Sequence, residues 1–314
     1  MPSTEPIPKL SGPLMGRVAT APISWGICEV PGWGEQLPAA RVATEMASLG
    51  FAATELGEFG FFPSEPGELR TWLEPHGLEM IGGFVSLVLH DPAEADKALA
   101  EATRLADFFA AAGSTFFNSA AVTTWDWAPR RELTADQWSH LSHMLACVGE
   151  ICAERGLTQV LHPHVDTVVE TGEEIIRVLD TSDVDFVFDT AHFAVGGCDP
   201  LAFALDHSDR VGLVHLKDVD SAVATRLNAE EITLLEAVQA GVFQTLGQGD
   251  LPMADIIIAL ENSGYANWYV LEQDVALTTG APPEGSGPVT QVELSLDFLR
   301  SVEAERLGGD GESS

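Results

Sequence analysis

The sequence is poor in positive charge. It contains 15 Lys and Arg against 48 Asp and Glu in 314 residues, for a formal net charge of −33. Because a nucleic-acid site needs a basic surface opposite the phosphates, this charge argues against a nucleic-acid partner, and it also disfavours adhesion to anionic membranes. The three lysines are Lys9, Lys97 and Lys217, and Lys217 lies in an otherwise apolar segment. We therefore take Lys217 as a candidate functional residue.

Long hydrophobic runs, export signals and paired cysteines are also missing. No apolar run reaches the roughly 18 residues that a membrane span needs. The first residues, MPSTEPIPKLSGP, have no basic region followed by an apolar one. The four cysteines form no Cys-x-x-Cys pair, and a chain of this size needs no disulfide. We expect a cytoplasmic protein with reduced thiols and no membrane partner, with a disordered leader at 1–15 and a disordered tail at 306–314.

What the sequence does contain is a regular alternation of short apolar segments and longer amphipathic ones. The short segments have the composition of buried strands, and the segments that follow have the 3.6-residue periodicity of helices. Strands are expected at about 17–23, 50–56, 78–85, 114–122, 158–164, 184–190, 210–218 and 267–274. Helices are expected at about 38–49, 65–76, 93–112, 134–155, 171–180, 200–207, 253–263 and 291–305, with a longer insertion at about 220–250.

Eight alternating strands and helices predict parallel βαβ units. At this length the most economical closed arrangement is a (β/α)8 TIM barrel, an α/β fold that forms a single domain over residues 16–305. An open, doubly wound sheet is the alternative. No Gly-x-Gly-x-x-Gly follows the first strand, so the barrel is preferred.

Polar residues stand at the ends of these strands, where the active site of such a barrel lies. They are Glu55, Asn118, His162, His164, Asp189, His192, His215, Lys217, Asp218, Glu272 and Asp274. The segment VLHPHVDT carries two of them: residues i and i+2 of a strand share a face, so His162 and His164 project into one space, and Pro163 marks the end of the strand.

Four of these residues follow the fifth to the eighth strand in turn: His162, Asp189, His215 and Glu272. Adjacent strands are about 4.8 Å apart, so the four side chains can converge on one point. A single His or Asp at a strand end is more often a structural residue, but four in register favour a metal site. Two imidazoles and two carboxylates suit Mn²⁺, Co²⁺, Fe²⁺, Zn²⁺ or Mg²⁺ better than a thiolate-seeking metal.

Five further residues are weaker candidates for substrate binding: Trp25, Glu55, Asn118, His192 and Asp218. Three of them have a structural alternative. The indole of Trp25 can stack on a substrate ring or close the end of the barrel. Glu55 can cap the loop after its strand, and Asn118 can serve turn chemistry.

The motifs resemble the xylose isomerase-like barrels, a family that includes sugar epimerases, inosose dehydratases and apurinic endonucleases. The resemblance spans about 17–300 and rests on DTAH at 189–192, HLKD at 215–218 and the Glu of WYVLEQD. In that family the Asp of the first motif, the His of the second and this Glu bind metal. APISWG, FAATELG, DTAHFAVGGCDP and LGQGDL are most similar to the inosose dehydratase branch.

Two departures from other branches refine this resemblance. Epimerases of the family usually place a Glu where His162 stands, and replacing one of two carboxylate bases favours elimination over epimerisation. The endonuclease branch carries further metal-binding histidines on its third and fourth strands. GGFVSLVLH and FFNSAA have no counterpart for them, and the negative charge would repel DNA.

The resemblance implies a divalent cation, Mn²⁺ or Co²⁺ first, and a carbohydrate or cyclitol substrate such as 2-keto-myo-inositol, from which water is removed. Glu272 and His164 are candidate bases, and Lys217 or His192 either protonates the leaving hydroxyl or orients hydroxyls. Which of His162 and His164 ligates the metal stays open. A keto-sugar isomerase or epimerase with the same metal site, a non-catalytic sugar-binding barrel and a homo-oligomeric state also remain open.

Overall fold

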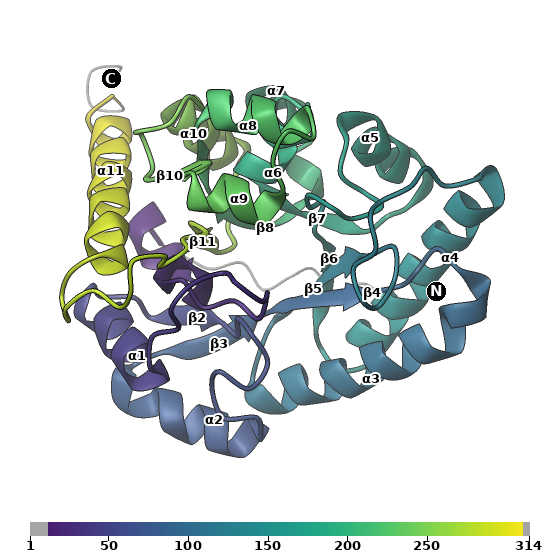
Figure 1. Cartoon of the computed structure of the whole chain (residues 1–314), viewed down its shortest axis with the longest axis horizontal. Helices are drawn as coiled ribbons and strands as arrows, with labels where there is room; N and C mark the ends of the chain where they lie inside the picture. Colours follow the sequence, from purple (N-terminus) through teal and green to yellow (C-terminus); the bar gives the residue numbers. More distant parts are fainter. Residues whose placement is uncertain (1–11, 310–314) are drawn as a thin grey trace.

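The computed structural model describes residues 12–309 and has a parallel sheet at its centre with helices around it (Figure 1). The strands are β1 (Val18–Thr20), β2 (Ala53–Glu55), β3 (Glu79–Gly82), β4 (Phe84–Leu87), β5 (Phe116–Ala121), β6 (Thr158–Leu161), β7 (Asp185–Asp189), β8 (Val211–Leu216) and β11 (Tyr269–Leu271). They pair in the order β3-β2-β1-β11-β8-β7-β6-β5-β4. Since only Gly83 separates β3 from β4, the two ends of this sheet belong to one interrupted strand. The sheet therefore forms the predicted eight-stranded barrel, and the open-sheet alternative is wrong.

The outer helices alternate with the strands as expected. They are α1 (Ala39–Ser48), α2 (Pro66–Leu73), α3 (Ala95–Ala112), α4 (Ala135–Ala153), α5 (Gly172–Thr181), α7 (Pro200–Asp206), α10 (Met253–Ser263) and α11 (Pro288–Gly309). Local sequence sets several of their starts. In α4 and α5 the hydroxyls of Thr134 and Thr171 accept from backbone N–H groups of the first turn, and the Gln137 and Glu174 side chains complete two capping boxes.

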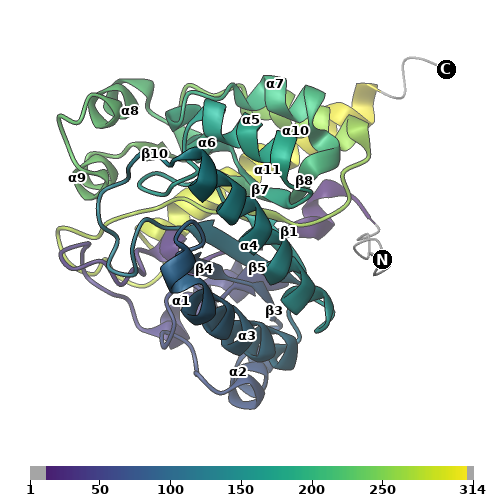
Figure 2. The ribbon, with the colours of Figure 1, turned by 90° about the vertical axis from the view of Figure 1, so that its right-hand side faces the viewer.

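The insertion has more structure than the sequence predicted. It contains β9 (Asp218–Val219), α8 (Ser221–Asn228), α9 (Leu234–Gln239) and β10 (Phe243–Gln244), and β9 pairs antiparallel with β10. A short helix, α6 (Thr190–Val195), was also missed because it begins directly at the end of β7. Its residues join those of the insertion in a small apolar cluster. Figure 2 shows α8, α9 and β10 together at one end of the molecule.

The domain boundaries differ from the predicted ones by a few residues. Residues 1–11 of the expected leader and 310–314 of the expected tail lie outside the described part of the chain. Between them the fold starts earlier and ends later than 16–305. A 3₁₀ helix, η1 (Leu14–Arg17), buries Leu14, and α11 continues to Gly309, with Arg306 donating to Glu261 at 3.0 Å. Within residues 12–309, no helix combines the length and apolarity that a bilayer span requires.

A layer of apolar side chains fills the barrel interior beneath the strand ends. Nearly every strand contributes one or two residues to it: Ala19, Ala21, Ala53, Ile81, Phe116, Val160, Val187, Leu213 and Val270 are all buried there, with Trp268. This layer supports the residues that follow it along each strand. Because side chains two residues apart share a face, the next inward position on most of these strands is one of the polar residues singled out above.

Candidate metal centre at the barrel mouth

Strand periodicity brings the four predicted ligands together. Each follows an interior apolar residue by two positions: His162 follows Val160, Asp189 follows Val187, His215 follows Leu213 and Glu272 follows Val270. The neighbouring strands β7 and β8 hold Asp189 directly beside His215 in register. Inward orientation of all four side chains is therefore a consequence of the two-residue repeat of the strands.

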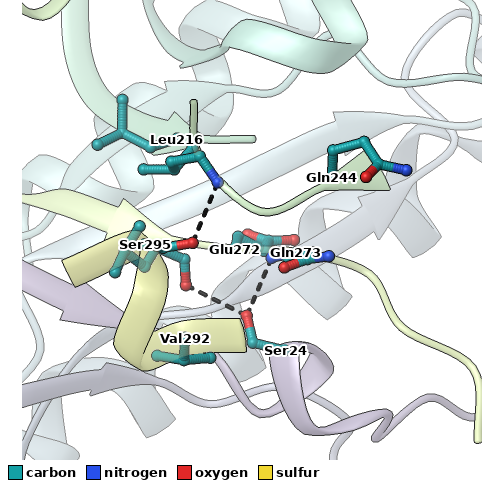
Figure 3. Close-up of a pocket in the computed structure, with 9 residues that line it drawn as sticks. Ser24, Leu216, Gln244, Glu272, Gln273, Val292 and Ser295 are labelled. Carbon is teal, nitrogen blue, oxygen red and sulfur yellow. Dashed lines mark hydrogen bonds between the residues drawn. The ribbon is translucent and has the colours of Figure 1, made fainter. Parts of the chain in front are cut away.

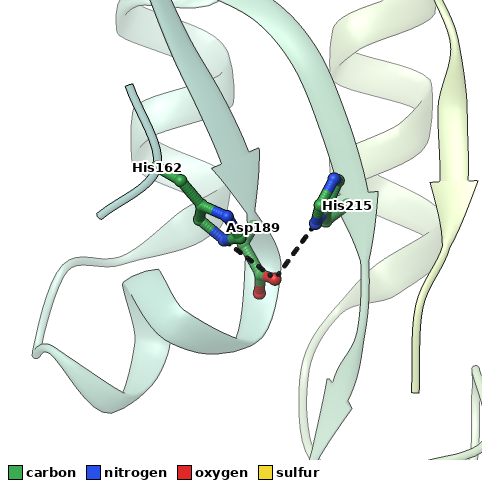
Figure 4. A group of neighbouring side chains, drawn as sticks. All are labelled: His162, Asp189 and His215. Carbon is green, nitrogen blue, oxygen red and sulfur yellow. Dashed lines mark ion pairs between the residues drawn. The ribbon is translucent and has the colours of Figure 1, made fainter. Parts of the chain in front are cut away.

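The donor atoms of His162, Asp189 and His215 lie close enough to one another to hold a cation, and Glu272 contacts His215 beside them. His162 Nε2 is 3.5 Å and His215 Nδ1 is 3.8 Å from Asp189 Oδ2, and these three side chains are shown in Figure 4. Glu272 Oε2 lies 2.5 Å from His215 Nδ1. Ligands bonded at about 2.1 Å to a tetrahedral ion stand about 3.4 Å apart, so His162, Asp189 and His215 are spaced to hold one ion. Glu272 forms a second possible group with Glu55 and His215, and its contact with His215 is at hydrogen-bond distance.

These donor atoms make no hydrogen bond within the described part of the chain, although several lie close to an oppositely charged group. Among the described residues, both ring nitrogens of His162 and His215, Oδ2 of Asp189 and Oε2 of Glu272 are buried without a hydrogen-bond partner. Buried polar atoms are normally satisfied, so an unsatisfied group of nitrogen and oxygen donors facing one point needs an explanation. A divalent cation supplies one, and the buried His, Asp and Glu cluster is consistent with a divalent metal site.

Asp189 divides its carboxylate between the helix and the cluster. Oδ1 accepts the backbone N–H groups of Ala191 and His192 at 3.0 and 2.9 Å and so caps α6. Oδ2 is left to face His162 and His215. The capping bonds therefore fix the orientation of the oxygen that is available to a cation.

The electrostatic field at the cluster favours a cation. Burial alone would lower the pKa of His215, but the carboxylates of Glu272 and Glu55 outweigh it and raise this pKa well above its usual range. His162 has less carboxylate support, and burial lowers its pKa. Burial opposes ionisation of Asp189, yet the charge of Lys217 and the neighbouring histidines hold its pKa well below the usual value. A positive charge placed between these groups would therefore be strongly attracted.

Glu55 contacts a predicted metal ligand directly. Its Oε2 lies 3.1 Å from His215 Nε2, while Asn118 Nδ2 donates to its Oε1 at 3.4 Å. Both side chains are buried, at 4% and 0% exposed. A carboxylate at the second nitrogen of a metal-binding histidine holds the proton there and leaves the other nitrogen free for the metal. This geometry favours positioning roles for Glu55 and Asn118, whose predicted substrate contacts are untested.

Lys217 lies beside the cluster, surrounded by carboxylates. Its Nζ is 2.8 Å from Asp274 Oδ1 and 3.3 Å from both Glu272 Oε1 and Asp189 Oδ2, and its side chain is 0% exposed. Nζ donates to Glu272 and Asp274 and lies 3.5 Å from His192 Nε2, while Asp189 is an ion-pair neighbour. The predicted role of Lys217 as a proton donor to substrate therefore has no support in the geometry, which gives it the role of balancing buried negative charge.

Asp274 was noted at the end of its strand but given no role by sequence reasoning. Its side chain is buried, and burial raises its pKa to about 6 even though the ammonium of Lys217 lies beside it. The signal that could have found it is the lysine directly after the apolar strand β8, since a buried cation requires buried carboxylate partners.

His164 and His192 form a close, tilted pair of rings next to the cluster. Their ring centroids are 3.8 Å apart, and the ring of His164 is 5.4 Å from that of His162. His164 Nδ1 lies 2.7 Å from the carbonyl oxygen of Val165, which can only accept, so the proton is on Nδ1 and Nε2 carries a lone pair. Burial, followed by the charges of His162 and Lys217, lowers the pKa of His164 to about 3. His164 is thus a neutral imidazole with one unoccupied nitrogen.

For two predicted substrate contacts the structure shows other partners. The indole of Trp25, in η2 (Pro22–Trp25), is 0% exposed, packs in the core and donates to Glu45 on α1 at 2.8 Å, so no ring can stack on it. Asp218 is also 0% exposed. Its two carboxylate oxygens accept four backbone N–H groups, from Val219, Gly247, Gly249 and Leu251, at 2.9 to 3.1 Å. Asp218 therefore fastens the insertion to the barrel.

Gly249→Ala should disturb this fastening. A Cβ at Gly249 would lie 2.3 Å from Asp218 Oδ1, so we expect the variant to lose about 2 kcal/mol of unfolding free energy through overpacking. Gly67→Ala is the matched control, because a Cβ there has no neighbour within 4 Å and alanine favours the helix α2. Urea unfolding of both variants measures the difference. Equal stability of the two would contradict the role given to Asp218.

A small cavity lies behind Glu272, between the ends of β8 and β11 and the helix α11 (Figure 3). Ser24 links its walls: its hydroxyl donates to the carbonyl of Leu271 and accepts the N–H of Gln273. Ser295 of α11 accepts the N–H of Leu246 in the insertion. The Ser24 bonds hold the backbone on both sides of Glu272 and so help to fix the position of this residue.

Comparison with known proteins agrees with the fold and motifs. A family model described as "Xylose isomerase-like TIM barrel" matches residues 43–302. The inosose dehydratase of Geobacillus kaustophilus (strain HTA426) is 30% identical over 295 residues, which cover 90% of this chain and 93% of that protein. The rhizopine catabolism protein MocC of Rhizobium meliloti is 28% identical over 298 residues, covering 92% of this chain and 89% of that protein.

Solved structures show the same barrel at lower identity. An L-ribulose 3-epimerase matches 95% of this chain and 98% of its own with a TM-score of 0.68 and 17% identity. A protein named IOLI, crystallised with a zinc atom, matches 92% of this chain and 98% of its own with a TM-score of 0.67 and 13% identity. At such identities the likeness concerns the fold alone. With the family match over most of the sequence, the resemblance expected from DTAH and HLKD is confirmed: the chain belongs to the xylose isomerase-like TIM barrel family.

Proposed function

We propose that the protein is a metal-dependent hydro-lyase that removes water from a cyclic polyhydroxy ketone such as 2-keto-myo-inositol. The observation that carries this proposal is the group of unsatisfied donors at the barrel mouth, next to the single free nitrogen of His164. The inosose dehydratase relative, which is similar over 90% of the chain, supports the substrate class.

The residues assigned to a divalent cation are His162, Asp189, His215 and Glu272. Their nitrogen and oxygen donors favour Mn²⁺ or Co²⁺, and Mg²⁺, Fe²⁺ and Zn²⁺ are also compatible. When bound, such an ion acts as a Lewis acid that polarises a carbonyl group. This assignment gives the metal to His162 and leaves His164 to the substrate, since both nitrogens of His162 lack a partner and Nδ1 of His164 has one.

His164 is assigned as the base that removes the proton next to the carbonyl. Its Nε2 has a lone pair, and the Val165 carbonyl holds the other nitrogen and therefore the ring orientation. The alternative base, Glu272, accepts from Lys217 Nζ at 3.3 Å through Oε1, and its Oε2 is assigned here to the metal, so neither oxygen is left for the substrate proton. After taking the proton, the imidazolium of His164 can return it to the departing hydroxyl, so that the products are water and the unsaturated ketone.

Epimerisation is the second candidate function. It would require a proton acceptor on each side of one carbon, and His164 after β6 and Glu272 after β11 come from different parts of the barrel wall. Both reactions begin with the same proton removal and depend on the same donor set. A cytoplasmic location and a homo-oligomeric state stay predictions from the sequence.

A proton NMR time course tests the proposal. Mn²⁺- or Co²⁺-loaded protein is mixed with 2-keto-myo-inositol in deuterated buffer, with EDTA as the control. We expect loss of substrate to an unsaturated or diketone product, abolished by EDTA. Deuterium incorporation or a new stereoisomer without loss of water would instead establish the epimerase, and an unchanged spectrum would remove the inosose assignment.

A further inference from the structure

Two exposed aromatic side chains lie at the barrel mouth and have no role in the chemistry described above. Phe84 begins β4, is in register with Asn118 on β5, and therefore points into the barrel. It is nevertheless 36% exposed, and Trp127 is 40% exposed. The two rings stack with centroids 6.1 Å apart and an interplanar angle of 20°. An inward-facing Phe that remains exposed lines open space at the mouth.

This aromatic pair contacts the metal cluster and the proposed base. The ring of Phe84 lies 5.6 Å from that of His162 and 5.5 Å from that of His164, edge-on in both cases. The Trp127 ring lies 6.3 Å from that of His164. A substrate that reaches His162 and His164 would therefore meet the aromatic pair on the same side.

The loop between β5 and α4 holds Trp127 in a costly backbone conformation. Its φ is +56°, which a residue with a large side chain rarely adopts and which costs about 1–3 kcal/mol. The Thr124 carbonyl accepts the Trp127 N–H, and the Thr124 hydroxyl accepts the N–H of Ala128. Trp125 ties the loop down through a 2.7 Å bond from its Nε1 to Glu94. The chain thus uses a strained but well-anchored turn to present Trp127.

We propose that Phe84 and Trp127 form an apolar wall of the substrate site that selects rings with C–H groups on the face turned towards them. The proposal rests on the cyclitol substrate class of the proposed function. In a chair with equatorial hydroxyls, all axial positions carry hydrogen, and these slightly positive hydrogens pack on the negative face of an aromatic ring. The remainder of the mouth is polar, which suits the equatorial hydroxyls and the ketone at the ring edge.

The substrate class fits this wall for a stereochemical reason. The single axial hydroxyl of myo-inositol is on the carbon that is oxidised in 2-keto-myo-inositol, so the remaining hydroxyls are all equatorial. Both faces of this ketone therefore carry axial C–H groups. An axial hydroxyl on the face turned to Phe84 and Trp127 would lose water without gaining a hydrogen-bond partner, which disfavours its binding.

Binding of unreactive cyclitols tests the wall without requiring turnover. scyllo-Inositol has only equatorial hydroxyls, whereas chiro-inositol has one axial hydroxyl on each face, so turning the ring over cannot avoid the contact. Calorimetric titration in the presence of Mn²⁺ should show that scyllo-inositol binds about tenfold more tightly, the scale expected for aromatic packing. Trp127→Ala should lower the affinity for scyllo-inositol to that for chiro-inositol. Trp127→Phe should keep most of the preference for scyllo-inositol.

The control is Leu205→Ala, which removes an exposed apolar side chain (64% exposed) on the outer helix α7 and should leave both affinities unchanged. Wild-type affinity for scyllo-inositol in Trp127→Ala, or an unchanged preference, would overturn the proposal, as would failure of scyllo-inositol to bind the wild type. Selective binding of scyllo-inositol without dehydration of 2-keto-myo-inositol would instead contradict the proposed reaction and still support the aromatic wall.

Discussion

Asp189→Asn is expected to abolish metal-dependent activity and to lower metal affinity by more than about a hundredfold, which is the upper range for loss of an outer-shell partner alone. The substitution removes the negative charge of Oδ2, which lies 3.5 Å from His162 Nε2 and 3.8 Å from His215 Nδ1. An amide can still accept the N–H groups at the start of α6, so the helix cap should survive. Calorimetric titration with Mn²⁺ and the EDTA-sensitive turnover assay measure the two losses.

Asp199→Asn is the matched control for this prediction. Asp199 caps α7 in the same way, with Oδ1 accepting the N–H groups of Leu201 and Ala202, but it is exposed and outside the cluster. Its substitution should leave metal affinity and turnover unchanged. A ligand that binds only the folded state also raises the melting temperature, so added Mn²⁺ should stabilise Asp199→Asn and the wild type but not Asp189→Asn. Retention of that stabilisation in Asp189→Asn would show that the donor set is wrongly assigned.

The parts of the site that the sequence predicted are those that depend on strand periodicity. The two-residue repeat places His162, Asp189, His215 and Glu272 on the same inner face as the apolar residues before them, so four independent segments lead to one point. The barrel itself follows from the same regularity. Neither inference requires knowledge of a side-chain conformation.

The parts that the sequence did not predict depend on which partner a polar group finds. Asp218 stands at a strand end like the ligands, but its carboxylate oxygens accept hydrogen bonds from backbone N–H groups within 247–251. The sequence pattern alone does not place a segment about 30 residues away next to this carboxylate. Trp25 similarly turns outward to Glu45. A phenylalanine in a strand is normally expected in the core. Only the shape of the barrel mouth leaves Phe84 exposed.

Removal of the buried ammonium group of Lys217 is expected to have the largest effect on the stability of the protein. Lys217→Met keeps the length of the side chain but leaves Asp189, Glu272 and Asp274 without the ammonium group that lies 2.8 to 3.3 Å from each of them. Breaking a buried ion pair by removing one partner costs about 3–5 kcal/mol, because the remaining charge is neither solvated nor paired. Urea unfolding of the EDTA-treated protein measures this cost. Lys97→Met is the control. The ammonium of Lys97 lies over the Trp125 ring on the surface, and we expect its removal to lower the free energy of unfolding by less than about 1 kcal/mol.

A double-mutant cycle separates the charge from simple packing. Asp274→Asn removes the carboxylate nearest to Lys217, so the double variant with Lys217→Met should be more stable than the sum of the two single losses predicts, by about 0.5–3 kcal/mol. If the effect of Lys217→Met were only a packing defect, the two losses would add. Additivity would therefore contradict the view that Lys217 balances the carboxylates beside the metal cluster. A positive coupling would explain why a chain with only three lysines buries one of them at the end of β8.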